Sequence, residues 1–103
     1  MMIYVLAITT AKPGMRDAAL KEFRANMPAI LAEPGCLEYG PATDAKDFGG
    51  LQTVLGDDAF VSIEKWQTPE ALKAHAAGAH FAAYAAKTKD LIATLIVHVL
   101  SPT

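Results

Sequence analysis

Cysteine is nearly absent from this chain of 103 residues, because Cys36 is the only one. A single cysteine excludes an internal disulfide and a cysteine-based metal cluster. We expect Cys36 to pack as a small apolar residue at a strand start rather than to act as a thiolate. The chemistry of the protein therefore does not depend on sulfur, and we expect a reducing, cytoplasmic setting.

Net charge is also small, at −2, with scattered lysines and a pI near 5.8. Such a chain has no basic field that would attract nucleic acid or an anionic membrane. The apolar run from Ile3 to Ile8 has no basic segment before it, no small-residue cleavage site after it, and too few residues to cross a bilayer. We therefore expect neither a nucleic-acid partner nor membrane insertion.

A chain of this length predicts one domain, residues 1–103, with one core that buries about 65% of the unfolded surface. Met2 to Ala11 is rich in β-branched residues and ends at a Lys-Pro-Gly turn, which predicts a strand. Apolar residues at spacings of three and four between Leu20 and Leu31 predict an amphipathic helix. Pro28 lies inside that helix, so we expect a kink or local unwinding there.

The middle of the chain predicts a second strand and a long loop. Cys36 to Thr43 reads as a strand, and Pro41 within it predicts a bulge or an edge position. Asp44 to Asp58 is longer than a hairpin needs, which is typical of a functional loop or lid. Its aspartates lack the spacing of a calcium loop, so a solvated loop is the interpretation we favour.

A strand-to-helix junction follows, and it holds the only tryptophan. An alternation with a period of two places four side chains on one face of the third strand: Phe60, Ser62, Glu64 and Trp66. Thr68 is a suitable N-cap, and Pro69 suits the first helical position. The helix then carries His75 one turn after Leu72, on a face that looks toward Trp66.

The C-terminal part predicts a broken helix and a last strand. Gly78 interrupts an alanine-rich helix, which restarts toward Lys89. Leu91 to Leu100 is apolar on both faces, so we expect both faces to be mostly buried. The resulting βαββαβ order predicts an α+β, ferredoxin-like antiparallel sheet with helices on one face. The other apolar face needs a cover, and on that ground we predict a homodimer.

Two motifs resemble one family. The first motif is Pro34-Gly35-Cys36-Leu37-x-Tyr39. The second is Glu64-x-Trp66, followed by Glu70-Ala71-Leu72-x-x-His75 and His80-Phe81. Both are similar to the antibiotic biosynthesis monooxygenase domain. The segment Tyr39-x-Pro41-x-x-Asp44 and the ending Val99-Leu100-Ser101-Pro102 most resemble its small quinol monooxygenase branch. This resemblance spans nearly the whole chain. It implies a dimeric α/β barrel that oxidises reduced naphthoquinones with dioxygen and uses no flavin, haem or metal.

Such chemistry needs a dry aromatic pocket, a base that works near neutral pH, and donors for the developing anion. The expected partners are a small aromatic, quinone-like substrate and dioxygen, with no cofactor. The candidate catalytic residues are His75 as the base, His80 as the second choice, and Glu64. The candidate substrate contacts are Trp66, Tyr39, Phe81 and Leu72.

Structural interpretations compete with each of these assignments. Trp66 can be a core anchor, His75 a buried and satisfied histidine, and Glu64 one half of a surface salt bridge. The five-residue spacing from His75 to His80 does not suit a metal pair on one helical face. His98, on the last strand, reads as an interfacial or partly exposed polar residue.

Three other functions remain as alternatives. The haem-degrading branch that shares this resemblance has a pattern with an asparagine on the first strand and an axial histidine late in the second helix. In this chain the only asparagine, Asn26, lies in the first helix, and Ala85 stands where the axial histidine would be expected. A cofactor-free isomerase or epimerase of a small hydroxy-carbonyl compound would use the same histidines without oxygen. A non-catalytic ligand-binding dimer would have no turnover at all.

Overall fold

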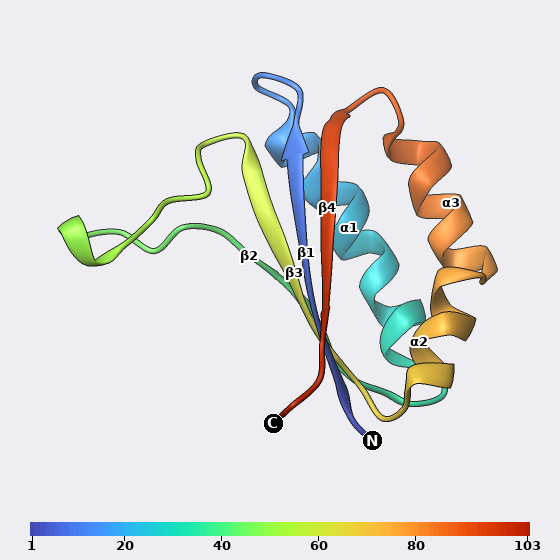
Figure 1. Cartoon of the computed structure of the whole chain (residues 1–103). Coiled ribbons are helices and arrows are strands. Elements are labelled where there is room, and N and C mark those ends of the chain that lie inside the picture. Colours follow the sequence, from blue (N-terminus) through green and yellow to red (C-terminus); the bar gives the residue numbers. More distant parts are fainter.

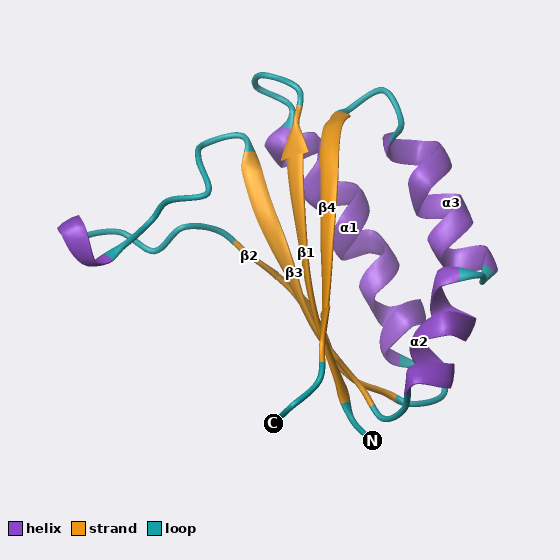
Figure 2. Ribbon diagram, viewed as in Figure 1, coloured by secondary structure: helices purple, strands orange, loops and turns teal.

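Four strands form one antiparallel sheet, and helices cover one of its faces (Figures 1 and 2). This computed structural model describes residues 1–103. The elements in chain order are β1 (Ile3–Ala11), α1 (Arg16–Leu31), β2 (Cys36–Ala42), β3 (Ala59–Trp66), α2 (Pro69–Ala76), α3 (Ala79–Thr88) and β4 (Ile92–Leu100). The strand order is β2-β3-β1-β4. This βαββαβ architecture confirms the predicted ferredoxin-like fold.

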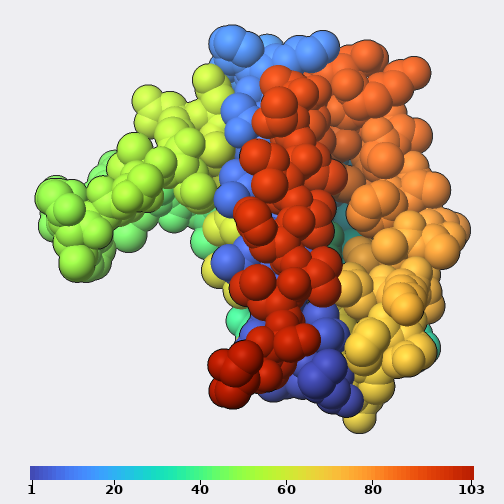
Figure 3. Space-filling view, viewed as in Figure 1, coloured from blue at the N-terminus to red at the C-terminus, as the bar shows by residue number.

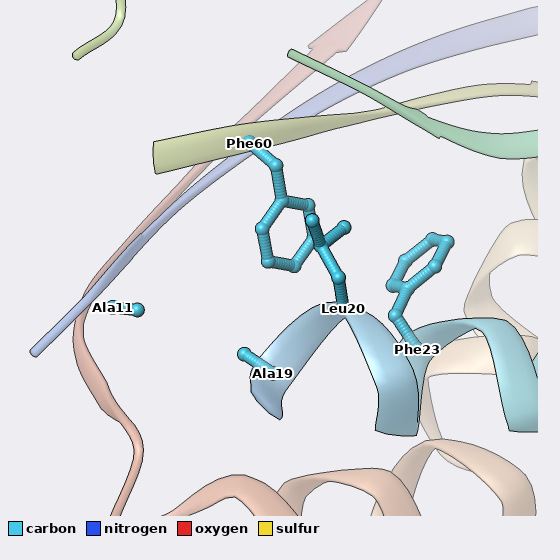
Figure 4. Close-up of a cluster of buried hydrophobic side chains, with 5 residues drawn as sticks. All are labelled: Ala11, Ala19, Leu20, Phe23 and Phe60. Carbon is cyan, nitrogen blue, oxygen red and sulfur yellow. The ribbon is translucent and has the colours of Figure 1, made fainter. Parts of the chain in front are cut away.

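The core lies between the central strands and α1. Leu20 and Phe23 on α1 pack against Phe60 of β3, together with Ala11 and Ala19 (Figure 4). A second cluster at the other end of the layer joins Ile3, Val5, Ile30 and Trp66. The buried side chains of β3 alternate as its period of two predicts, so one face of this strand supplies both the core and the candidate site.

The helix α1 runs to Leu31 without a break at Pro28, so the predicted local unwinding is absent. Proline removes only one amide donor, and the Pro28 carbonyl still accepts from the Ala32 N–H at 3.3 Å. Ile30, which is 1% exposed, holds the last turn against the sheet. Packing of this buried residue outweighs the missing hydrogen bond.

The second helical region begins and breaks where the sequence predicts. The Thr68 side chain accepts the Ala71 N–H at 3.1 Å as the N-cap of α2. Gly78 separates α2 from α3, which confirms the predicted break. Gly35 lies where the turn before β2 meets α2. It has φ +82°, and a Cβ atom there would stand 2.6 Å from the Ala71 Cβ, so the close approach requires glycine.

The strand β2 is an edge strand, which agrees with the prediction from Pro41. Its register shift lies between Cys36 and Glu38 rather than at Pro41. Residues 43–58 then form an arm that leaves the sheet on the side opposite to the helices (Figures 1 and 2). A short 3-10 helix, Gly49–Leu51, lies near its tip. At its base the Asp44 carboxylate accepts from the backbone N–H groups of Leu55 and Gly56 at 2.8 and 2.9 Å.

The strand β4 is the other edge strand, and the expectation that both its faces are buried is wrong for the single chain. Every residue from Ala93 to Leu100 is exposed, and the strand crosses the surface as a continuous ridge in Figure 3. The reason is that only β1 pairs with it, while α2 and α3 leave most of its inner side uncovered. No helix in the chain combines the length and the hydropathy that a bilayer crossing requires.

Candidate functional site

A cavity of about 280 Å³ lies between the inner face of the sheet and the helices. Four of the predicted residues line it: Tyr39 of β2, Glu64 of β3, His75 of α2 and Phe81 of α3. Most of the remaining lining is apolar or aromatic. A mainly apolar cavity with a few converging polar groups is the usual form of a small-molecule site.

His75 lines this cavity and is 6% exposed. Three aromatic rings surround its imidazole: Trp66, Phe81 and Tyr39, with centroid distances of 4.7, 5.7 and 5.8 Å. The ring therefore has almost no rotational freedom. The structure thus places His75, the residue predicted as the base, in an aromatic wall of the cavity.

Glu33 is a site residue that the sequence interpretation missed. Its Oε1 is 2.8 Å from the His75 Nδ1, and its Oε2 is 2.7 Å from the His80 Nδ1. A carboxylate only accepts hydrogen bonds, so beside an ionised Glu33 the neutral form of the His75 ring carries its proton on Nδ1, and its lone pair is on Nε2. The hydrogen bond that His75 makes within the chain uses Nδ1 and not Nε2. The geometry therefore presents a free lone pair, which is what a general base needs.

One local signal could have pointed to Glu33. It directly follows the C-cap of α1, Ala32, where the negative end of the helix dipole disfavours a carboxylate. An acidic residue at that position breaks a local rule, and such exceptions are often functional.

Glu64 is a buried carboxyl on the cavity wall, with 6% of its surface exposed. The Trp66 indole N–H donates to Oε1 and the Ser62 hydroxyl donates to Oε2, both at 2.9 Å. Burial raises the pKa of Glu64, although these two donors and the nearby His75 partly oppose the shift. The interpretation as a surface salt bridge is therefore wrong, since Lys65 pairs with Glu38 instead.

Three predicted site residues lie outside the cavity. Trp66 is 0% exposed and has no free face for a ligand, because it packs beneath His75 and holds Glu64. Leu72 packs into the core cluster that includes Trp66. The side chain of His80 is 48% exposed and lies on the far side of His75, toward solvent. Their expected direct contact with substrate has no geometric support in the chain.

Stacked and edge-to-face aromatic rings also line the cavity. Tyr39 stacks on Phe23 with centroids 5.0 Å apart and planes at 5°. Tyr84 meets Phe23 edge to face at 5.9 Å. Burial raises the pKa of Tyr39 above its ordinary value and the pKa of Tyr84 to about 12, so both phenols are neutral near pH 7. The cavity thus offers flat aromatic walls of a size that suits a small ring system.

The antibiotic biosynthesis monooxygenase family matches residues 2–87 of this chain. The chain belongs to this family. Within the family fold, the cavity has no side chain at position 85 that could serve as an axial haem ligand, because Ala85 lines it. No group of three or more metal-binding side chains converges anywhere in the chain. The groups that the site does present are an imidazole, a carboxyl group and aromatic surfaces.

Relatives of known sequence and structure agree with this family assignment. "Probable quinol monooxygenase YgiN" of Escherichia coli is 31% identical over 103 residues, which cover 98% of both chains. The crystal structure of PA3566 from Pseudomonas aeruginosa has 27% identity and a TM-score of 0.81, and the match covers 99% of this chain and 94% of that one. Rv0793 from Mycobacterium tuberculosis shares the fold, with a TM-score of 0.81, 24% identity and coverage of 100% and 96%.

Proposed function

We propose that the protein is a cofactor-free monooxygenase or oxidase that acts on a quinol or another dihydroxy-aromatic compound with dioxygen. The observation that carries this proposal is the imidazole of His75, which lines an aromatic cavity and contacts Glu33 through Nδ1, so that Nε2 is free of that carboxylate. Family membership supports the monooxygenase class, and the name of the Escherichia coli relative supports a quinol as the substrate.

In the first step a substrate hydroxyl gives its proton to His75 Nε2. The imidazolium that forms lies 2.8 Å from the Glu33 carboxylate, which stabilises the new positive charge. The substrate anion is then electron-rich enough to pass an electron to dioxygen. Stacking against aromatic rings such as Phe81 would hold the planar anion in the cavity.

The electrons and atoms balance for either outcome of the second step. If the radical pair recombines, one oxygen atom enters the ring, and a quinol plus dioxygen gives a hydroxyquinone plus water. If the pair separates and a second electron follows, the products are a quinone and hydrogen peroxide. In both cases the proton on His75 returns to the reduced oxygen, so the protein ends in its starting state. Glu64, on the same wall, would orient a second substrate hydroxyl.

The test is oxygen uptake by the metal-stripped protein supplied with a reduced naphthoquinone, corrected for spontaneous oxidation. His75→Ala should lower kcat/KM by at least about 100-fold, because general-base catalysis typically contributes 10² to 10⁴. Lys87→Ala is the control, since Lys87 is exposed on α3, outside the cavity and away from the uncovered sheet face, and it should keep full activity. Labelled dioxygen followed by mass spectrometry separates insertion from simple oxidation. Equal rates for His75→Ala and the wild type would refute the assignment of the base.

An isomerase is the second candidate, and one observation favours it. His75 and Glu64 line the same cavity, and burial raises the pKa of Glu64, so the site holds a base and a potential proton donor without any need for oxygen. Turnover of a hydroxy-carbonyl compound under anaerobic conditions would establish this reaction. Ligand binding with no turnover in either assay would favour a binding protein.

We also propose that two copies form a dimer through the sheet face that the helices leave uncovered. Apolar side chains on this outer face include Leu6, Ile63, Ile96 and Leu100, which are 37 to 54% exposed. An apolar face of this kind on a small protein commonly marks an interface. The arm of residues 43–58 projects on the same side of the sheet and carries exposed Phe48 and Leu51 (Figures 1 and 3).

Light scattering after size exclusion tests the dimer. The wild type should elute at twice the chain mass, and Ile96→Glu should elute as a monomer, because a charge would be buried at the centre of the interface. Lys87→Glu on the helical side is the control and should leave the mass unchanged. A monomeric wild type would refute the proposal. The cytoplasmic setting expected from the single cysteine stays a prediction.

A further inference from the structure

We infer that His80 is a positioning residue, which acts through Glu33 to fix the proton of the cavity histidine His75 on Nδ1. The inference deepens the proposed function and rests on it for its kinetic consequence, while its structural consequence can be tested without turnover. It replaces the predicted direct role of His80, whose ring does not reach the cavity.

The two histidines face one carboxylate from two helices. His75 lies near the end of α2, and His80 lies in the first turn of α3 beyond the break at Gly78. Because the helix restarts there, residues five apart can both turn toward Glu33, which a continuous helix would not allow. Each imidazole Nδ1 meets a different oxygen, at 2.8 Å for His75 and 2.7 Å for His80.

His75 is the wall between two spaces. It lines the apolar cavity, and it also lines an open groove on the other side, together with Glu33 and His80. Glu33 therefore stands on the solvent side of the base, with 15% of its side chain exposed. A carboxylate at such a place could rotate toward water if only one of its oxygens were held. The second donor, from His80, restrains that rotation.

His80 is itself held in place. The Asn26 side-chain amide of α1 donates to the His80 backbone carbonyl at 3.1 Å. The resulting chain of contacts runs from α1 through His80 and Glu33 to the base. Since an ionised carboxylate can only accept, both imidazoles donate from Nδ1, and neither Nε2 carries a proton in the neutral rings. This arrangement leaves the His75 lone pair on Nε2, the ring nitrogen that does not contact Glu33.

Other charged groups near the cluster do not replace His80 in this role. Glu64 faces His75 from β3 but makes its hydrogen bonds to Ser62 and Trp66. Burial, and after it the nearby Glu33 carboxylate, raises the pKa of the Cys36 thiol on β2, and that thiol donates to the Glu38 carbonyl instead. Glu70 lines the groove and is a further acceptor rather than a donor. His80 is thus the only side chain that donates to Glu33 Oε2.

The experiment uses nitrogen-15 NMR of the imidazole rings in the whole protein at about pH 9, where histidine is ordinarily neutral. This measurement reports which ring nitrogen carries the proton. We compare the wild type, His80→Ala and His80→Asn. The Asn side-chain amide lies near the place of the His Nδ1 donor, so it can restore the hydrogen bond without an imidazole. His98, the third histidine, is the internal reference in every sample.

The wild type should show His75 with its proton on Nδ1. In His80→Ala the ratio of Nε2–H to Nδ1–H on His75 should rise about fivefold, the effect of losing one hydrogen bond of ordinary strength, and His80→Asn should reverse most of that rise. In the oxygen-uptake assay kcat should fall about three- to tenfold in His80→Ala and recover in His80→Asn, with KM little changed.

Each outcome decides the inference. An unchanged His75 proton position in His80→Ala would overturn it, and so would an equal change in His80→Ala and His80→Asn, because the effect would then come from the lost ring and not from the donor. If the proton position on His75 changes in His80→Ala while the wild type shows no quinol turnover, the result would support the positioning role and refute the proposed function. The two failures are therefore distinguishable.

Discussion

Replacement of Trp66 by phenylalanine separates the structural role of this residue from the ligand-stacking role that its sequence position suggested. Trp66 is 0% exposed and donates its indole N–H to Glu64 at 2.9 Å. Phenylalanine keeps an aromatic ring beneath His75 but has no donor. The variant therefore removes one buried hydrogen bond and part of one buried ring.

The expected loss of unfolding free energy has two parts. A hydrogen bond to an ionised carboxylate contributes about 1.5–3 kcal/mol. The smaller ring leaves roughly 40 Å³ unfilled, which costs about 1 kcal/mol at about 24 cal/mol per Å³. The sum is about 3 kcal/mol, a large share of the roughly 5–15 kcal/mol that stabilises a small domain.

Urea unfolding at about pH 8 measures this loss, at one fixed protein concentration because a dimer would make the midpoint depend on concentration. A double-mutant cycle with Glu64→Gln should give a coupling of about 1 kcal/mol, since a neutral amide accepts the indole N–H less strongly. Phe60→Leu is the control: Phe60 is equally buried on the same strand face, makes no side-chain hydrogen bond, and should show no coupling to Glu64. A loss of only about 1 kcal/mol for Trp66→Phe, with no coupling, would refute the reasoning.

Three further predictions follow from the same geometry. The pKa of Glu64 is raised in the folded state, so its contribution to stability is complete below the ordinary carboxyl pKa and is lost as pH rises through the folded pKa. The unfolding free energy of Glu64→Gln should therefore rise relative to that of the wild type as pH increases. Urea midpoints measured across that pH range check this, and a constant difference between the two proteins would contradict it. Gly35→Ala should destabilise the fold by more than about 2 kcal/mol, because the new Cβ would lie 2.6 Å from the Ala71 Cβ. Gly14 also has a positive φ, +77°, but has open space around it, so Gly14→Ala should cost only about 1 kcal/mol. Thermal unfolding compares the two variants. Thr68→Ala should cost about 1 kcal/mol through the lost N-cap, and an unchanged melting temperature would refute that role of Thr68.

Sequence reasoning reached the architecture because the fold depends on local patterns. The alternation from Phe60 to Trp66, the cap at Thr68 and the break at Gly78 each depend on neighbouring residues, and the structure confirms all three. Pro28 shows where such reasoning fails. Its local cost predicted unwinding, but the burial of Ile30 by the sheet keeps the last turn helical.

The candidate site was only partly predictable. His75, Glu64, Tyr39 and Phe81 carry chemical types and a spacing that pointed to a cavity, and all four line it. The inward face of Trp66 was predicted correctly, but periodicity does not reveal whether a side chain reaches a cavity or fills the layer beneath it. That distinction depends on the depth of packing between the sheet and the helices.

The sequence by itself determined the element order, the helix caps and breaks, and the histidine that faces the cavity, because each of these is set by side chains a few residues apart. Only the tertiary structure decided that Glu33 joins His75 and His80, since the carboxylate and the imidazoles are 42 and 47 residues apart in the chain. It also decided that β4 stays exposed in the single chain, because burial of an edge strand depends on what packs against it. Contacts between distant segments exist only once the helices lie on the sheet.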